Sequence, residues 1–376
     1  MTHRERVLAA LARRAPDRVP LDLGGTLAST MTEPAHERLR AHLGTGAGRP
    51  AAVFSRRAST VIPDEAILER FQVDCRPVVL GAPEDRAATA GSLIDEWGIR
   101  WWRPEGGHYI PKDGPLQRLE DPAPACLEHY TWPDPANPAR NRGLREWAAA
   151  LHEGGDTAVV LNLGVGPVHQ GQYLRGYAEW LADLLERPAF AEALLDLTAD
   201  FWIQAAVRAL EETAPFVDLV CFGDDIGTQR APLMRPALYR QLVKPRHRRM
   251  MEAVKRFAKP VVFHTCGAVY PLIPDLIEIG IDALNPVQVS AAGMDAGRLK
   301  REFGGSLAFW GAIDTQRVLP WQTPDQVRQE VARRIAELGE GGGYVLSAVH
   351  NIQAEVPPEN VVAMYEAALA YGGGAQ

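Results

Sequence analysis

Short apolar runs alternate with longer amphipathic segments along most of the chain beyond residue 155. The runs have the length of buried strands, and the segments between them repeat apolar positions every three or four residues, as helices do. The expected strands lie at residues 158–162, 217–221, 260–263, 281–284, 307–309 and 344–346. The expected helices lie at residues 176–186, 189–211, 236–257, 270–279, 324–338 and 361–371. Strands that are joined through helices pair in parallel, so the pattern predicts a parallel sheet with helical crossovers.

A further strand is expected at residues 19–23, after a helix at residues 3–14. At least seven such strands form either a closed barrel or an open doubly wound sheet. No G-x-G-x-x-G motif follows a strand, so a dinucleotide-binding open sheet has little support. We therefore predict an α/β fold, a (βα)8 TIM barrel that forms one domain over residues 1–376. Its regular βα units span residues 155–370, and residues 1–150 form an irregular N-terminal elaboration rich in Pro, Gly and Trp.

Composition and charge limit the classes of function. The formal net charge is -7, whereas a protein that binds nucleic acid normally carries a basic excess. No apolar run reaches the roughly 18 residues that a membrane-spanning helix needs. The polar N-terminus lacks the apolar segment of a secretory signal. These features predict a cytoplasmic protein that binds neither nucleic acid nor membrane, and in which the scattered cysteines do not form a disulfide framework.

Polar or glycine-rich residues follow the end of each expected strand. In a (βα)8 barrel, catalytic residues cluster at the C-terminal ends of the strands, so these residues are expected on one face. They include Asp22, Asn162, Asp224, Asp225, His264, Cys266, Asn285, Gln288 and His350. The pattern predicts a ring-shaped site.

A zinc site is the first hypothesis for this face. His264 and Cys266 are two positions apart, so in an extended chain both side chains project to the same side. Imidazole and thiolate are both natural zinc ligands, and a catalytic zinc ion needs a third protein ligand and one open position. His350 is the best-placed candidate for the third ligand. The alternatives are Asp224, Asp225 and Cys221. Cys266 is otherwise a buried thiol that packs at the barrel rim.

Acid–base and substrate-binding groups are expected on the same face. Asp224 and Asp225 are adjacent carboxylates that repel each other, which can raise the pKa of one and suit it to general acid–base catalysis. Each of the two is otherwise a helix cap or a loop carboxylate. His169 either reaches the site or lies on a surface loop, and the loop is favoured. The candidate substrate-binding residues are Asn162, Asn285, Gln288 and Asp22.

Several motifs together resemble the uroporphyrinogen decarboxylase superfamily. They lie at residues 224–229 (DDIGTQ), 264–267 (HTCG), 282–288 (DALNPVQ), 308–314 (AFWGAID), 341–344 (GGGY), 350–352 (HNI) and 356–360 (VPPEN). The resemblance implies a (βα)8 barrel with its cleft at the C-terminal face. True decarboxylases of this family bind a tetrapyrrole without a metal and carry an arginine-rich loop after the first strand. Residues 21–36 of this chain contain neither Arg nor Lys, which disfavours a pocket for many carboxylates.

The other branch is the corrinoid-dependent methyltransferases, which carry H-x-C and a later cysteine as zinc ligands. His264 and Cys266 match the first two positions, no cysteine follows them, and His350 lies near the place of the third. The resemblance therefore implies a zinc-dependent methyltransferase that moves a methyl group between a small substrate or thiol and a corrinoid on a partner protein. It also implies a homodimer, with Asp224 or Asp225 moving the proton. Two alternatives stay open: a decarboxylase that acts on a porphyrinogen or a smaller carboxylate, and a barrel that binds a ligand without catalysis.

Overall fold

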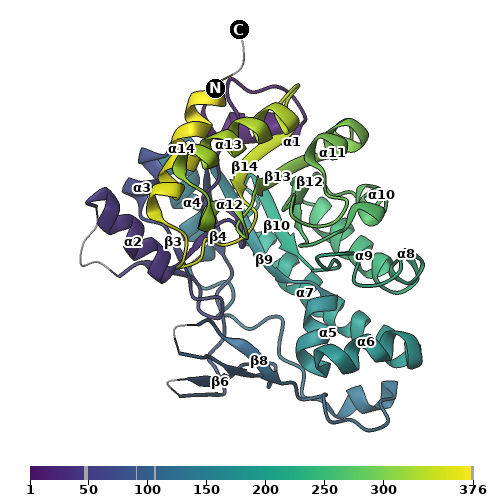
Figure 1. Cartoon of the computed structure of the whole chain (residues 1–376). Coiled ribbons are helices and arrows are strands. Elements are labelled where there is room, and N and C mark those ends of the chain that lie inside the picture. The colour runs from purple at the N-terminus through teal and green to yellow at the C-terminus, as the bar shows by residue number, and fades with distance from the viewer. Residues whose placement is uncertain (46–49, 90, 106, 374–376) are drawn as a thin grey trace.

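A curved sheet of seven parallel strands, surrounded by helices, forms the centre of the molecule in the computed structural model (Figure 1). The structure describes residues 1–45, 50–89, 91–105 and 107–373. The order of the strands in the sheet is β14 (Tyr344–Ala348), β13 (Ala308–Ile313), β12 (Ala283–Asn285), β11 (Val261–His264), β10 (Leu219–Gly223), β9 (Ala158–Val165) and β4 (Cys75–Val79). All neighbouring pairs are parallel, as the alternation of strands and helices predicts.

The segment around Leu21 closes this sheet into a barrel. Leu21 forms a parallel bridge with Leu346 of β14, and the Asp22 N–H donates to the Leu346 carbonyl at 2.9 Å. On the other side, the N–H of Asp74, directly before β4, donates to the Leu21 carbonyl at 2.8 Å. The TIM barrel is therefore confirmed, although the strand expected at residues 19–23 is reduced to a single bridge.

The sequence pattern missed β4, which lies in the part of the chain that was expected to be irregular. Arg76 and Pro77 interrupt its apolar run, so the run does not have the composition of a buried strand. Arg76 is nevertheless buried, because its guanidinium pairs with Glu65. Pairing with β9 along its whole length makes this segment a strand.

Helices cover the outside of the barrel and follow the strands in the chain. They are α4 (Leu144–Gly154), α5 (Pro167–Arg175), α6 (Tyr177–Glu186), α7 (Pro188–Thr213), α8 (Pro236–Leu238), α9 (Lys244–Lys255), α10 (Ile273–Glu278), α11 (Ala296–Phe303), α12 (Val318–Trp321), α13 (Pro324–Leu338) and α14 (Pro358–Tyr371). The helix expected at residues 236–257 is divided by a π-helical turn, Tyr239–Val243. Pro245 explains this irregularity, because it lacks the N–H that would continue the α-helical hydrogen bonds. Among the described residues, no helix is long and apolar enough to cross a membrane.

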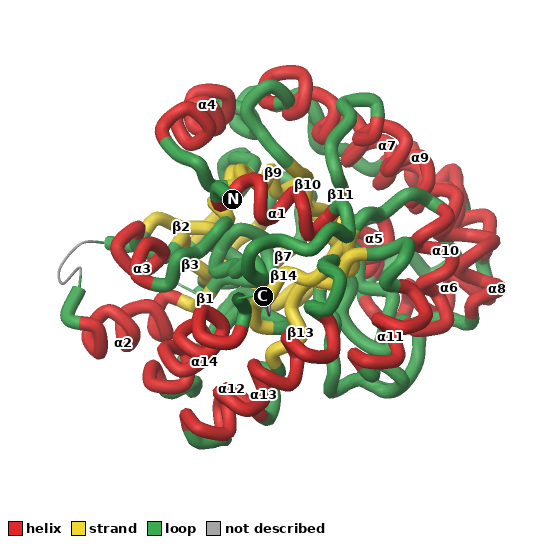
Figure 2. Tube along the Cα trace, turned by 90° about the horizontal axis from the view of Figure 1, so that it is seen from above, coloured by secondary structure: helices red, strands yellow, loops and turns green. Residues whose placement is uncertain are grey.

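Apolar side chains, most of them small, fill the barrel interior. They include Cys75, Ala158, Val160, Leu219, Cys221, Val262, Ala283, Ala308, Trp310 and Val345. Helix α1 (His3–Leu11) adds Val7, Ala10 and Leu11 to this cluster and thus closes the N-terminal end of the barrel (Figure 2). Side chains alternate along a strand, so the next inward positions toward the C-terminal ends are Asn162, His264 and Asn285. The barrel therefore carries a polar layer above an apolar one.

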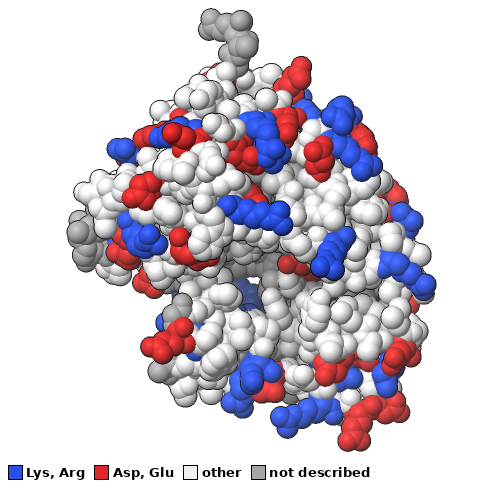
Figure 3. All heavy atoms as spheres, in the orientation of Figure 1, with Lys and Arg blue, Asp and Glu red and all other residues white. Residues whose placement is uncertain are grey.

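The N-terminal part of the chain adds two small antiparallel sheets and the helices α2 (Glu33–Leu43) and α3 (Glu65–Arg70). One sheet consists of β1 (Met31–Thr32), β3 (Thr60–Ile62) and β2 (Ala52–Ser55), and the other of β5 (Ala87–Ala88), β6 (Ser92–Ile94), β7 (Arg100–Trp102) and β8 (Ile110–Asp113). The four-stranded sheet lies at the end of the barrel opposite the two termini (Figure 1). A hollow separates it from the barrel (Figure 3). The N-terminal elaboration thus faces the C-terminal ends of the barrel strands.

A buried carboxylate links α1 to the closing segment of the barrel. Asp74 is fully buried, and it accepts hydrogen bonds from Arg6 Nη1 at 2.6 Å, from Arg18 Nη1 at 2.7 Å and from the Leu21 N–H at 2.7 Å. Burial by itself would raise the pKa of this carboxyl, but the hydrogen bond with His3 and the charge of Arg18 hold it below its usual value. Asp74 therefore stabilises the fold above its unfolded pKa, and this contribution is lost as pH falls through the lower folded pKa.

We expect Asp74→Asn to lower the free energy of unfolding by about 3 kcal/mol, because it leaves two arginines beside a neutral buried group. Urea unfolding at neutral pH measures this loss. Asp17→Asn is the matched control, since Asp17 also pairs with Arg6 but its side chain is 44% exposed. It is expected to cost less than about 1 kcal/mol. Equal losses in the two variants would contradict the structural role of Asp74.

Candidate metal centre

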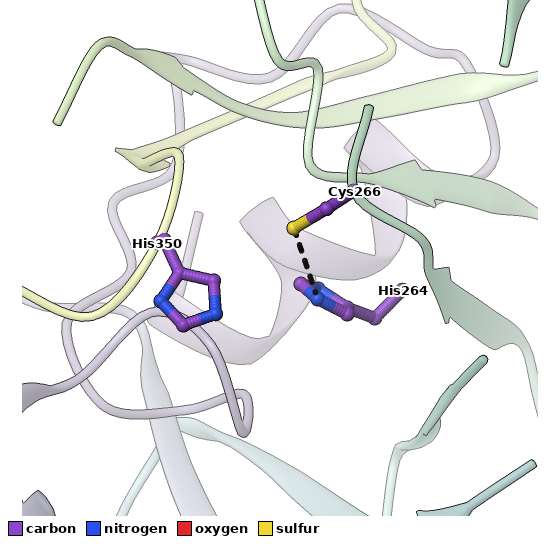
Figure 4. Close-up of side chains that lie close together, drawn as sticks. All are labelled: His264, Cys266 and His350. Atoms are coloured by element: carbon purple, nitrogen blue, oxygen red, sulfur yellow. Dashed lines mark hydrogen bonds between the residues drawn. The ribbon is translucent and has the colours of Figure 1, made fainter. Parts of the chain in front are cut away.

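Three side chains with metal-ligating atoms converge at the C-terminal end of the barrel. One ligand atom from each of His264, Cys266 and His350 lies within 4.8 Å of the other two. His264 is the last residue of β11, and His350 follows β14 by two residues. The sulfur of Cys266 points at the His264 ring, and the His350 ring faces both from a separate segment (Figure 4). The structure thus brings together the three residues that were predicted as metal ligands.

The spacing of these groups suits a zinc ion. His264 Nε2 lies 3.5 Å from Cys266 Sγ, and the ring centres of His264 and His350 are 6.0 Å apart. Tetrahedral zinc with ordinary bond lengths places a sulfur and a nitrogen ligand about 3.6 Å apart. Two imidazoles and one thiolate form the mixed nitrogen and sulfur set that zinc prefers, and three protein ligands leave one position open. The donor set therefore fits a catalytic zinc site.

The protonation states of the three candidate ligands differ. Desolvation lowers the pKa of His264, and desolvation together with the neighbouring His264 lowers the pKa of His350 to about 4. Both imidazoles are therefore neutral at neutral pH, as ligation requires. Burial, and then the charge of Asp225, raise the pKa of the Cys266 thiol well above its usual value. The thiol must therefore lose its proton when a cation binds.

Asn285 lies behind His264. Its Oδ1 accepts a hydrogen bond from His264 Nδ1 at 2.6 Å, which leaves the lone pair of Nε2 directed at Cys266. Metal-binding histidines commonly have such a partner on their second nitrogen, and it fixes the orientation of the ring. Asn285 was predicted to bind substrate, but the structure places it as the group that orients a candidate ligand.

The two adjacent aspartates point to different places. Asp224 is fully buried at the N-terminus of α5, where it accepts the N–H groups of Val168 at 2.9 Å and His169 at 2.8 Å. Its Oδ2 also lies 2.9 Å from His247 Nε2. A negative charge at the start of a helix is stabilising, so Asp224 holds α5 in place. The geometry leaves Asp225 as the candidate acid–base group of the pair.

Asp225 lies beside the three candidate ligands. Its Oδ1 accepts the Cys266 N–H at 2.7 Å and lies 3.9 Å from His264 Nε2. Burial by itself would raise its pKa, but the charges of His169 and His264 hold the pKa below its usual value. The expected rise in pKa from two repelling carboxylates is therefore wrong for Asp225, since imidazoles surround this carboxylate. Asp225 is an ionised base at neutral pH.

His169 belongs to this group, although the sequence favoured a surface loop. It lies in the first turn of α5, where Nδ1 accepts the Asp225 N–H at 3.2 Å and Nε2 lies 3.5 Å from Asp225 Oδ2. Its ring stacks on Tyr173 with 5.6 Å between the ring centres. Gly166-Pro167 marks the start of a helix directly after β9, and this was the signal that could have placed His169 at the strand-end face.

Two other predicted substrate-binding residues, Asp22 and Asn162, lie in the barrel interior. Asp22 is fully buried and accepts the Gly25 N–H at 2.7 Å and the Trp310 indole N–H at 2.8 Å. Burial raises the pKa of Asp22 to about 6. Asn162 donates to the Gly25 carbonyl at 2.9 Å, and its buried Oδ1 has no partner among the described residues. Asn162 therefore retains a free acceptor below the site.

Gln288 stabilises the loop that carries Cys266. Its Oε1 accepts the Gly267 N–H at 2.7 Å, and its Nε2 donates to Gln229 Oε1 at 2.9 Å. Gly267 has φ of +95°, a left-handed conformation that favours glycine. Both the oxygen and the nitrogen of the Gln288 amide thus form hydrogen bonds within the protein, and one of these bonds stabilises the loop of Cys266.

Comparisons with known proteins agree with this architecture. The family model described as Uroporphyrinogen decarboxylase (URO-D) matches residues 109–371. A uroporphyrinogen decarboxylase of Alkalilimnicola ehrlichii is 23% identical, over 96% of this chain and 93% of its own length. The methylcobamide:CoM methyltransferase MtbA of Methanosarcina mazei is 24% identical, over 56% of this chain and 58% of its own length. The solved structure of a methyltransferase from Methanosarcina mazei has the same fold, with a TM-score of 0.71, 20% identity and 99% coverage of both chains.

The family match includes the strands and loops that carry all three candidate ligands, and it extends over well more than half of the chain. The relatives that match this chain in sequence include decarboxylases and a methyltransferase. The chain therefore belongs to the uroporphyrinogen decarboxylase family.

Proposed function

We propose that this protein is a zinc-dependent methyltransferase, which moves a methyl group between a small substrate or thiol and a corrinoid carried by a partner protein. The observation that supports it most is the convergence of His264, Cys266 and His350 within 4.8 Å at the catalytic face of the barrel. The similarity to a methylcobamide:CoM methyltransferase supports the same branch of the family. The absence of Arg and Lys from positions 21–36 disfavours a tetrapyrrole with several carboxylates.

Each residue of the site has a distinct task in this proposal. His264, Cys266 and His350 would hold zinc, which supplies Lewis-acid activation of a thiol or of the heteroatom that carries the methyl group. Asn285 keeps the His264 ring in the ligating orientation. The Asp225 carboxylate accepts the proton that a thiol substrate releases, or returns a proton to the demethylated heteroatom.

Metal analysis and a methyl-transfer assay test this function. We expect the purified protein to contain about one zinc ion per chain, as three protein ligands and an open position require. We also expect it to demethylate methylcobalamin in the presence of a thiol, or to methylate reduced cobalamin from a methyl donor, as absorbance changes of the corrinoid report. Absence of stoichiometric zinc would rule out the proposal.

The pKa of Cys266 predicts how zinc binding depends on pH. Because this thiol is protonated in the free protein and both imidazoles are neutral, zinc binding should release about one proton. The affinity for zinc is then expected to rise by about tenfold per pH unit around neutrality. Calorimetric titration of the metal-free protein with zinc, in two buffers of different ionisation enthalpy, counts the released protons. A proton count of zero would contradict ligation by Cys266.

A further inference from the structure

A fixed cation lies on the N-terminal elaboration. Arg57, in the turn between β2 and β3, pairs with Asp95 at 3.0 Å, and its guanidinium lies 4.8 Å from the ring centre of Trp101. The side chain of Arg57 is 39% exposed, whereas that of Asp95 is 1% exposed. Among the residues that the structure describes, the Arg57 side chain has no other ion pair or hydrogen bond. One part of the guanidinium is therefore anchored while the rest is accessible.

Asp95, which holds the Arg57 guanidinium in place, also accepts hydrogen bonds from three neutral N–H groups. Asp95 Oδ1 accepts the N–H groups of Trp97 at 2.9 Å and Ile99 at 3.0 Å. Its Oδ2 accepts the Trp101 indole N–H at 2.8 Å. Three neutral donors thus stabilise the buried carboxylate besides Arg57. The cation is preorganised, which lowers the entropy cost of binding an anion.

Aromatic rings connect this cation to the candidate metal centre. Trp101 contacts Tyr173 with 5.1 Å between ring centres, and Tyr173 stacks on His169, which lies 3.5 Å from Asp225. Arg57 and Asp225 both act electrostatically on Tyr173, so both charges lie near this tyrosine. Figure 3 shows basic side-chain atoms inside the hollow between the barrel and the four-stranded sheet. Arg57 is therefore linked to the candidate metal centre by a wall of contacting side chains, namely Trp101, Tyr173, His169 and Asp225.

The hydroxyl of Tyr173 is a free hydrogen-bonding group on this wall. Burial raises the pKa of Tyr173 to about 12, so the hydroxyl keeps its proton at neutral pH. Within the described parts of the chain, the Tyr173 hydroxyl has no hydrogen-bond partner, and part of the side chain is exposed. The wall thus offers a guanidinium, a neutral O–H donor and flat ring faces.

We propose that the substrate is a small aromatic carboxylate whose methyl group is carried on a heteroatom, with the carboxylate bound by Arg57 and the Tyr173 hydroxyl. The ring lies against Tyr173 and His169, and the methyl-bearing heteroatom lies at His264, Cys266 and His350. A guanidinium binds a carboxylate through charge-assisted hydrogen bonds, and aromatic faces favour a flat ring over an aliphatic chain. This inference rests on the proposed function and adds the class of substrate to it.

A matched pair of probes tests the charge requirement. 3-Methoxybenzoate and the neutral 3-methoxybenzamide are titrated calorimetrically into the wild type, Arg57→Gln, Arg57→Lys and Arg56→Gln. Arg56 is the control, since it is the neighbouring arginine and pairs with Asp85 at 2.7 Å, with 61% of its side chain exposed. We expect Arg57→Gln to weaken benzoate binding by about tenfold or more, since a charge-assisted contact is lost. Arg56→Gln should change it by less than about twofold, and Arg57→Lys should retain part of the affinity.

The inference is overturned if the wild type shows no saturable binding of 3-methoxybenzoate, binds the amide equally well, or is unaffected by Arg57→Gln. Thermal unfolding shows whether Arg57→Gln remains folded. If Arg57→Gln does not fold, the comparison of Arg57→Lys with the wild type tests the role of the guanidinium instead. Zinc content and Arg57-dependent binding are separate measurements, and repeating the titrations with Cys266→Ala shows whether benzoate binding requires the candidate metal ligand. Arg57-dependent binding without zinc in the wild type would reject the methyltransferase alone, and bound zinc without Arg57 dependence would reject the substrate class alone.

Discussion

Cys266→Ala is expected to remove zinc from the protein and to abolish methyl transfer. Cys266 supplies the only anionic donor among the three candidate ligands, and the two imidazoles that remain leave zinc with a neutral, incomplete set. Loss of a group that merely orients a ligand costs about 10- to 100-fold in metal affinity, so loss of the thiolate should cost more. Metal content after dialysis, and competition with a chelator of known affinity, measure the change.

Cys126→Ala is the control for this experiment. Cys126 is partly exposed in the short 3-10 helix Pro124–His129, far along the chain from all three candidate ligands. We expect this variant to bind zinc and to turn over like the wild type. The same zinc content in Cys266→Ala and Cys126→Ala, with both proteins folded, would refute the metal centre.

Asp225→Asn is expected to lower the rate of methyl transfer by about 10²- to 10⁴-fold while zinc stays bound, since general acid–base groups contribute that much. The amide oxygen can still accept the Cys266 N–H, which Asp225 Oδ1 accepts at 2.7 Å, so the ligand loop keeps its support. The amide cannot take up a proton as the ionised carboxylate does. The kcat of methyl transfer and the zinc content of the same preparation are the two measurements.

Asp224→Asn should show the opposite pattern. Asp224 is fully buried and holds the N-terminus of α5 and His247, so we expect the free energy of unfolding to fall by about 3 kcal/mol. Asp225→Asn should change it by less than about 1 kcal/mol. Chemical denaturation of both variants compares them. If Asp224→Asn loses turnover while its stability is unchanged, and Asp225→Asn keeps full turnover, then the acid–base roles are reversed.

The arrangement of the barrel could be predicted wherever a strand is a short apolar run followed by an amphipathic helix. From β9 to β14, apolar runs and amphipathic helices alternate, and this local pattern is enough to require parallel strands. The strand predicted at residues 19–23 is shorter than expected, and β4 was not predicted at all. Leu21 forms only one bridge, and β4 contains Arg76 and Pro77, so both segments become part of the barrel through their neighbours.

The location of the site followed from the sequence for a similar reason. Parallel strands all end at one face, so polar residues at strand ends must lie near one another, whichever side chains they carry. His264, Cys266 and His350 were found by this rule, and the structure brings them within 4.8 Å. The direction of each side chain was not available from that rule, so it did not reveal that Asn285 bonds to His264 or that Gln288 bonds to the loop of Cys266.

By itself, the sequence determined the barrel, the face that carries the site and the three residues most suited to bind a metal. Hydrophobic periodicity and the positions of strand ends depend on neighbouring residues, so they can be read from the sequence alone. Only the tertiary structure showed that Asp225, and not Asp224, lies beside the candidate ligands. It also showed that His169 contacts Asp225 and that Arg57 lies on the same wall. These assignments depend on contacts between segments far apart in the chain, such as Arg57 with Trp101 and Asp225 with His169. Burial and hydrogen-bond partners, which decide the charge and task of each group, arise only when those segments pack together.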